Sequence, residues 1–137
     1  MKNNKKEIFE SQDLEKCLDK IKDWSTKRKA VEICGFLGFK NDKYILWHCQ
    51  NIAEDPTKYF AIDPLDFLVF KEENKILCVF HSHIFGNENP SEFDVTMSEN
   101  CCVPFMIYSL NTKKFKIFKP KTNEADGFIL SKVEKAI

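Results

Sequence analysis

KILCVFH, residues 75–81, is an almost unbroken apolar run within a chain of 137 residues. A short continuous run of this kind, with no alternation of polar and apolar residues, is typical of a central β-strand that is buried on both faces. The run ends in a histidine, and a second histidine follows at position 83. The polar residues that follow the strand are therefore the first candidates for a functional site.

The segments around this strand alternate between helical and extended patterns. Apolar residues recur at helical spacing between Leu14 and Trp24, with Ser11 or Asp13 as the expected cap, and Asp63 precedes Pro64 as the cap of a second helix. We predict helices over 14–24, 64–73 and 91–101, and strands over 31–39, 43–49, 75–81, 103–110 and 114–119. The last dozen residues fit either a helix or a strand. This order predicts the α/β (α+β) class, with a mixed central sheet flanked by helices.

Length and composition predict one domain over residues 1–137, with a flexible start over residues 1–10. Lysine plus arginine balances aspartate plus glutamate at 21 each, which argues against a nucleic-acid or membrane binder that is driven by bulk charge. No segment approaches the roughly 20 apolar residues of a membrane span, and the N-terminus lacks the apolar core of a signal peptide. The six cysteines form no CxxC pair. Together these features predict a cytoplasmic protein with free thiols.

His81 and His83 are two residues apart at the end of the predicted central strand. Residues at this spacing point to the same side of an extended chain, so both imidazoles can reach one point. Asp94 lies eleven residues after His83, in the predicted helix 91–101, and the intervening loop can fold that helix back against the strand. Two histidines and one carboxylate are the ligand set of a catalytic zinc site, in which a fourth position stays open.

Two further residues suit hydrolysis at such a site. Ser91 lies one helical turn before Asp94, so its hydroxyl could stabilise a developing oxyanion. Glu32 is an acidic residue in an otherwise apolar segment, where an ionised carboxylate is costly without a function, and we select it as the general base.

The series His-Ser-His, seven residues, Ser, two residues, Asp resembles the motif of the JAMM (MPN+, JAB) metalloprotease family, as does Glu32 before Ile-Cys-Gly. The resemblance implies a cytidine-deaminase-like MPN domain that binds one Zn²⁺ per chain through His81, His83 and Asp94. It also implies Glu32 as general acid/base, Ser91 as oxyanion support, and hydrolysis of a peptide or isopeptide bond. Ile84 departs from the family, because many members have proline there.

Residues 51–56 and 60–64 resemble the prokaryotic and phage branch of this family. That branch includes peptidase domains of phage tail assembly and enzymes that process ubiquitin-like sulfur carriers. The resemblance therefore implies a protein or peptide substrate, with a ubiquitin-like protein as one candidate, and no nucleic acid or membrane as partner. A homodimer is left open.

Several alternatives remain at this point. Ser91 could serve only as a helix cap, and Glu32 could pair with Lys29. His48 and Cys101 are expected to pack rather than to bind metal. The chain could also be a non-enzymatic MPN scaffold, or a zinc hydrolase of a small amide. Barrel-type amidohydrolases, which also use a His-x-His pair, need roughly 250 residues, so the length argues against them.

Overall fold

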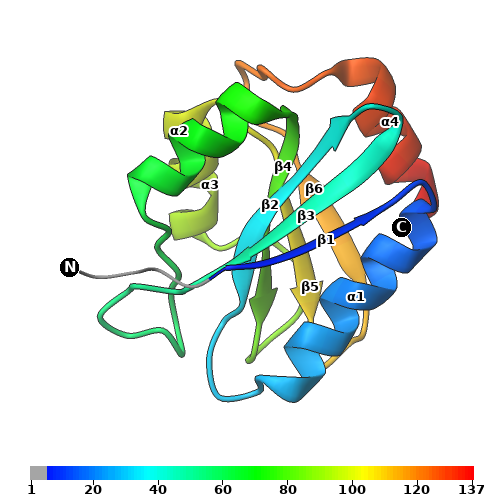
Figure 1. Ribbon diagram of the computed structural model, residues 1–137. Helices are drawn as coiled ribbons and strands as arrows, with labels where there is room; N and C mark the ends of the chain where they lie inside the picture. Colours follow the sequence, from blue (N-terminus) through cyan, green and yellow to red (C-terminus); the bar gives the residue numbers. More distant parts are fainter. Residues whose placement is uncertain (1–5) are drawn as a thin grey trace.

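The computed structural model describes residues 6–137, and this part of the chain folds into a six-stranded sheet flanked by four helices (Figure 1). The elements in chain order are β1 (Glu7–Ser11), α1 (Leu14–Lys27), β2 (Cys34–Lys40), β3 (Lys43–Cys49), α2 (Pro64–Glu73), β4 (Lys75–His83), α3 (Glu92–Cys101), β5 (Phe105–Ser109), β6 (Phe115–Phe118) and α4 (Gly127–Ala136).

The strands lie in the order β1-β3-β2-β4-β5-β6. All neighbouring strands are antiparallel except β4 and β5, which are parallel, so the chain must cross over between them, and α3 forms this crossover. The apolar run at residues 75–81 is the first part of β4, which has a neighbour on both sides. The predicted class, a mixed sheet flanked by helices, is confirmed.

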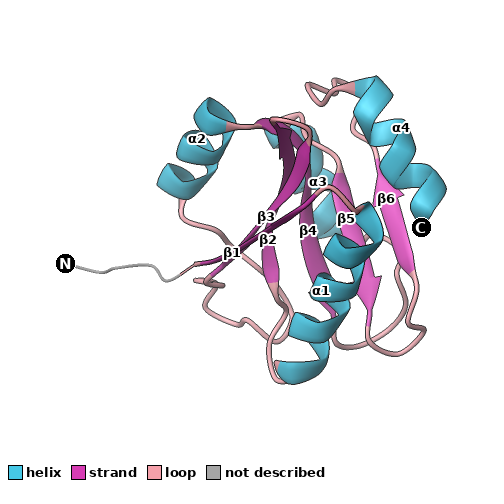
Figure 2. Ribbon diagram, turned by 45° about the vertical axis from the view of Figure 1, so that its right-hand side comes forward, coloured by secondary structure: helices cyan, strands magenta, loops and turns pink. Residues whose placement is uncertain are grey.

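Helices cover both faces of the sheet (Figure 2). On one face, α1 and α4 bury apolar side chains such as Ile21 and Val133 against the sheet. On the other face, α2 and the end of α3 pack through residues such as Phe70 and Cys101. The apolar side chains of β4 are therefore divided between two cores: Leu77 and Phe80 lie in one, and Ile76 and Val79 lie in the other.

The N-terminal segment differs from the expectation. Residues 1–10 were predicted to be flexible, but residues 7–11 form β1, which pairs along its whole length with the edge of β3. Residues 1–5 lie outside the described part of the chain. Phe9 packs against the core, whereas Ile8 points to solvent. The strand was missed because its pairing depends on the free edge of β3, which local composition does not reveal.

Element boundaries also shift. β2 begins at Cys34 and not at Val31, so Glu32 lies in the connection that leads into the strand. Asp13 is the cap of α1, since its carboxylate accepts a hydrogen bond from the amide of Glu15, while Ser11 ends β1. The ambiguous C-terminal segment is the helix α4, which Asp126 caps.

A glycine in β2 allows α2 to approach the sheet closely. A Cβ atom at Gly38 would lie 2.6 Å from the ring of Phe70, the buried residue of α2.

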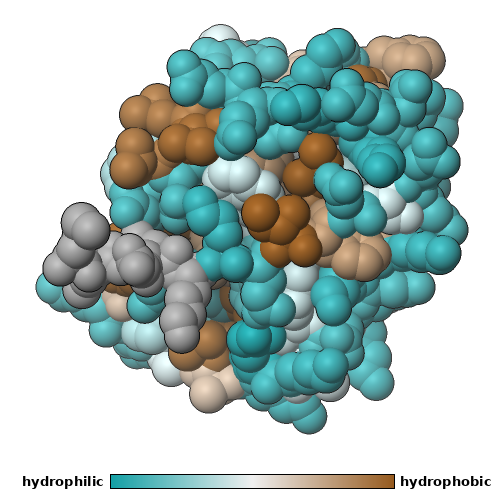
Figure 3. Space-filling model, in the orientation of Figure 1, coloured by the Kyte–Doolittle hydropathy of each residue, from teal (hydrophilic) through white to brown (hydrophobic). Residues whose placement is uncertain are grey.

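The outer side of α2 leaves Leu65 and Leu68 largely exposed. Figure 3 shows apolar side chains gathered at the upper left, over α2.

Candidate metal centre

The end of β4 directs two histidines to the α3 side of the sheet. His81 is fully buried, and its ring stacks on Phe60 with 4.3 Å between ring centroids. His83 is the last residue of β4, and 12% of its side chain is exposed. The two rings are 5.2 Å apart, as expected for residues two apart on a strand. The strand thus positions one buried imidazole and one at the surface of the site.

The start of α3 supplies the carboxylate. Ser91 is the cap of the helix and Asp94 is its third residue, and the two form a reciprocal capping box. The Ser91 hydroxyl accepts a hydrogen bond from the Asp94 amide at 3.1 Å, and Asp94 Oδ2 accepts one from the Ser91 amide at 2.9 Å. This arrangement fixes the rotamer of Asp94, which is buried.

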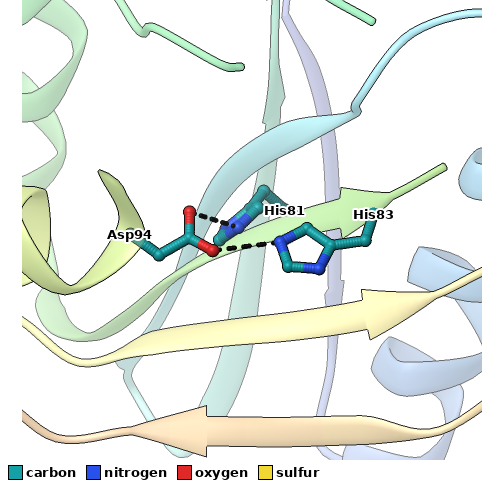
Figure 4. Close-up of side chains that lie close together, drawn as sticks. All are labelled: His81, His83 and Asp94. Carbon is teal, nitrogen blue, oxygen red and sulfur yellow. Dashed lines mark hydrogen bonds and ion pairs between the residues drawn. The ribbon is translucent and has the colours of Figure 1, made fainter. Parts of the chain in front are cut away.

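The three side chains converge on one point (Figure 4). Asp94 Oδ1 lies 3.0 Å from His81 Nε2, and Asp94 Oδ2 lies 3.0 Å from His83 Nε2. One candidate ligand atom from each residue lies within 4.8 Å of the others. Among the described residues, these three form the one group of histidine, cysteine or acidic side chains that could hold a metal ion.

The hydrogen bonds around the histidines fit a cation. His83 Nδ1 lies 2.8 Å from the carbonyl oxygen of Asn87, which can only accept, so Nδ1 carries the proton. With Nδ1 protonated, neutral His83 would present the lone pair of Nε2 to a cation beside the Asp94 carboxylate. Both nitrogens of His81 are buried: Nδ1 has no hydrogen-bond partner among the described residues, and Nε2 has only the contact with Asp94 Oδ1 at 3.0 Å. A cation between the three groups would satisfy His81 Nε2 and the lone pair of His83 together.

The carboxylate and the imidazoles influence one another. Burial alone would raise the pKa of Asp94, but its hydrogen bonds with His81 and His83 hold that pKa well below its usual range. Burial lowers the pKa of His81. Burial also acts to lower the pKa of His83, but its hydrogen bonds to Asp94 and to the Asn87 carbonyl outweigh this and raise it. Asp94 is therefore ionised and His81 neutral at neutral pH, as metal ligands must be.

Glu32 lies beside this group. Its amide donates to the carbonyl oxygen of Pro56 at 2.7 Å, and its own carbonyl accepts from the Asn51 side chain at 2.9 Å. Glu32 is buried, and this burial raises the pKa of its carboxyl to about 8, with the negative charge of Asp94 adding to the effect and His83 opposing it. Among the described residues Glu32 forms no ion pair, so the alternative pairing with Lys29 is absent.

Ser91 is exposed at the edge of the site, so its hydroxyl is accessible from solvent. Its structural role as a cap is present, since the hydroxyl accepts from the Asp94 amide. A hydroxyl that accepts one hydrogen bond still has its own proton to donate. Capping and oxyanion support are therefore compatible in the same side chain.

Three contacts around the site were not predicted from the sequence. They are the stacking of Phe60 on His81, the Asn87 carbonyl that fixes His83, and the hydroxyl of Ser82, which accepts from the Ile33 amide at 2.9 Å. The last contact joins β4 directly to the segment that carries Glu32. Ser82 alone had a usable signal, because a residue between two inward-facing histidines must point to the other face of the sheet.

A cavity of about 800 Å³ is lined in part by Glu32. It is lined by Glu32, Arg28, His48 and Asn51, among others, and by none of the three residues of the candidate metal group. His48 is buried in its wall and packs against Trp24, with 4.7 Å between ring centroids. Cys101 packs in the core beside α2, as expected.

Residues 14–120 match the family described as prokaryotic homologues of the JAB domain. The chain belongs to this family. The match covers the described elements from α1 to the end of β6, and it includes all five candidate site residues of this JAB domain.

This JAB domain is 23% identical over 107 residues to a protein named tail tip assembly protein K of Escherichia phage N15. The aligned region is 78% of this chain but 44% of the relative, so the chain spans less than half the length of that protein. It also resembles the solution structure of protein DSY2949 from Desulfitobacterium hafniense, with a TM-score of 0.52 and 22% identity, over 76% of this chain and 75% of the other. This second likeness supports the fold.

None of the helices in the described part of the JAB domain combines the length and the apolar character that a membrane crossing needs.

Proposed function

We propose that this JAB domain is a zinc-dependent peptidase or isopeptidase that hydrolyses an amide bond. His81, His83 and Asp94 would hold the ion, Glu32 would transfer protons, and Ser91 would support the oxyanion. The observation that carries the proposal is the convergence of two imidazole nitrogens on one buried carboxylate, with both nitrogens of His81 otherwise unpartnered. Nitrogen and oxygen donors in this number are the set that catalytic zinc sites use.

When bound, zinc would act as a Lewis acid and would make water acidic enough to serve as a nucleophile near neutral pH. Glu32 would accept a proton from the attacking water and then pass it to the leaving amine. In the absence of metal the pKa of Glu32 is raised to about 8, so the carboxyl is mostly protonated at neutral pH. The positive charge of a bound ion would lower this pKa and favour the basic form.

Ser91 would contribute through its free hydroxyl proton. The oxyanion of a tetrahedral intermediate is stabilised most by donors that are already fixed in place. The capping box holds Ser91 at the start of α3, three residues from Asp94, so its hydroxyl needs little reorganisation to donate into the site.

The substrate class is proposed from sequence similarity. The relative named tail tip assembly protein K favours a protein of a phage tail as substrate. The C-terminus of a ubiquitin-like protein is the second class to test, and a small amide is the third. All six cysteines are free thiols, which supports function in a reducing compartment such as the cytoplasm.

The proposal is tested first by metal content and then by hydrolysis. Elemental analysis of the purified protein should find one zinc ion per chain. Hydrolysis should be measured on a panel of ubiquitin-like fusions, carrier–cysteine adducts and short peptides. A metal-free protein that cleaves no member of the panel, but forms a stable complex with another protein, would indicate a scaffold instead.

Glu32→Gln separates metal binding from chemistry. The substitution keeps the size of the side chain but removes the base, so zinc content should stay at the wild-type level while kcat falls by roughly 10²–10⁴-fold. Glu54→Gln is the matched control, because Glu54 is an exposed acid in the neighbouring loop, and it should retain full activity. Near wild-type turnover in Glu32→Gln would exclude the assigned role.

A further inference from the structure

The loop between β4 and α3 holds His83 in its orientation, yet it has no regular secondary structure. It includes Gly86, which has a φ of 79°, and Asn87, whose carbonyl oxygen accepts a hydrogen bond from His83 Nδ1. Such a loop is more mobile than a helix or strand unless other segments hold it. Those contacts come from the end of β5 and the turn that follows.

Ser109 provides the central contact. It is the last residue of β5 and lies directly opposite His83 in the parallel β4–β5 pair. It is fully buried, and its hydroxyl donates to the Gly86 carbonyl oxygen at 3.0 Å. The same oxygen of Ser109 accepts from the amides of Asn111 and Thr112, each at 3.2 Å. These two incoming bonds leave the hydroxyl proton free to point at Gly86.

Additional bonds tie the same two segments together. The side-chain amide of Asn111 donates to the Gly86 carbonyl at 3.0 Å, and the Thr112 hydroxyl donates to Glu88 at 2.7 Å. The amide of Leu110 donates to the carbonyl of His83 itself at 3.1 Å. Asn111 and Thr112 are exposed, so Ser109 is the buried member of this network.

We infer that Ser109 is a positioning residue for the candidate metal centre, acting on His83 through Gly86 and Asn87. Its hydroxyl fixes Gly86, the neighbouring Asn87 carbonyl then holds the proton on His83 Nδ1, and Nε2 is left to face Asp94 as a metal donor. Outer hydrogen bonds that set the tautomer and orientation of a ligating histidine commonly control metal affinity. The inference rests on the proposed role of His83 as a metal ligand.

The experiment uses Ser109→Ala in the full chain, with two readouts. Long-range ¹H–¹⁵N correlation spectra of the metal-free protein, recorded below the pKa of His83, should show a His83 Nδ1 proton that the Asn87 carbonyl protects from exchange with solvent in the wild type, and faster exchange of this proton in the variant. Zinc affinity, measured by competition with a chelator, should fall by about 10–100-fold. Asn111→Ala, at an exposed position, should change both readouts in the same direction but less.

Ser98→Ala is the matched control. Ser98 is also fully buried and donates to a backbone carbonyl, that of Val103, at 2.7 Å, but it lies outside this network. It should lower the unfolding temperature and leave the exchange of the His83 Nδ1 proton unchanged. The inference is overturned if Ser109→Ala lowers only the unfolding temperature, with the His83 Nδ1 proton still protected and zinc affinity unchanged. The exchange of this proton is measured without metal or substrate, so a chain that hydrolyses nothing would still decide this question.

Discussion

Two buried histidines on opposite faces of the sheet differ in what surrounds them. His48 on β3 packs against Trp24 on the α1 face, and His81 on β4 stacks against Phe60 on the α3 face. Burial lowers the pKa of both, and both have at least one ring nitrogen without a hydrogen-bond partner among the described residues. By burial and protonation alone the two residues are equivalent.

Convergence with other donors distinguishes them. The carboxylate near His48 belongs to Glu7, which is 3.4 Å away, is half exposed and is paired with Arg28. His81 faces Asp94, which is almost fully buried and also contacts His83. A neutral buried histidine is therefore not evidence for a metal site. The evidence is a shared, desolvated carboxylate that no lysine or arginine among the described residues neutralises.

The largest expected effect is on zinc affinity, when Asp94 loses its charge. Asp94→Asn keeps an oxygen that can accept from the Ser91 amide, so α3 should still be capped. It removes the negative charge and one oxygen that could bind the metal. Loss of an outer hydrogen-bond partner costs up to roughly 100-fold in metal affinity, and loss of a ligand should lower zinc affinity by more than that. Isothermal titration with zinc measures the change.

His48→Gln is the control for that experiment, since it removes the other buried imidazole. It should bind zinc as tightly as the wild type, and saturating zinc should stabilise it by about 2.7 kcal/mol at 100 times the Kd. Equal zinc affinity in Asp94→Asn and the wild type would show that the convergence of the three groups has no role in metal binding.

A smaller effect separates the two roles of Ser91. Ser91→Gly removes the hydroxyl but should cost only a few tenths of a kcal/mol, whereas Ser91→Ala should cost about 1 kcal/mol through loss of the cap. If the hydroxyl donates to the oxyanion, both variants should lose roughly 10²–10³-fold in kcat. Chemical denaturation and turnover measure the two roles independently. Turnover that falls in proportion to stability alone would indicate a cap with no chemical part.

The sequence predicted those features that depend on local spacing. The His-x-His spacing on β4 and the Ser-x-x-Asp spacing at the start of α3 each define one side of a local element, and the structure brings the three candidate ligands together. β1 and Ser109 were not predicted, because both act through residues far away in the chain, on β3 and on Gly86. No periodicity in the sequence encodes which distant segment will lie beside them.

The last prediction concerns pH and the structural histidine His48. Burial and the charge of Arg28 lower the pKa of His48 from 6.5 to about 4 in the folded protein, despite Glu7 nearby. Between these values the unfolded chain binds a proton that the folded protein excludes, so the free energy of unfolding should fall as the pH drops through this window. Above pH 6.5 this contribution should be constant.

His83 acts in the opposite direction in the metal-free protein. The raised pKa of His83 stabilises the folded state at pH values below the ordinary pKa of histidine. This stabilisation is lost as the pH rises through the pKa of His83 in the folded protein. The two slopes overlap, so the test is the difference between the wild type and His48→Gln, both with chelator present. Urea unfolding followed by circular dichroism, from about pH 8 to about pH 4, should give a steeper loss of stability for the wild type. Parallel curves over this range would mean that His48 is protonated in the folded state as readily as in the unfolded chain, and that its burial against Trp24 has no electrostatic cost.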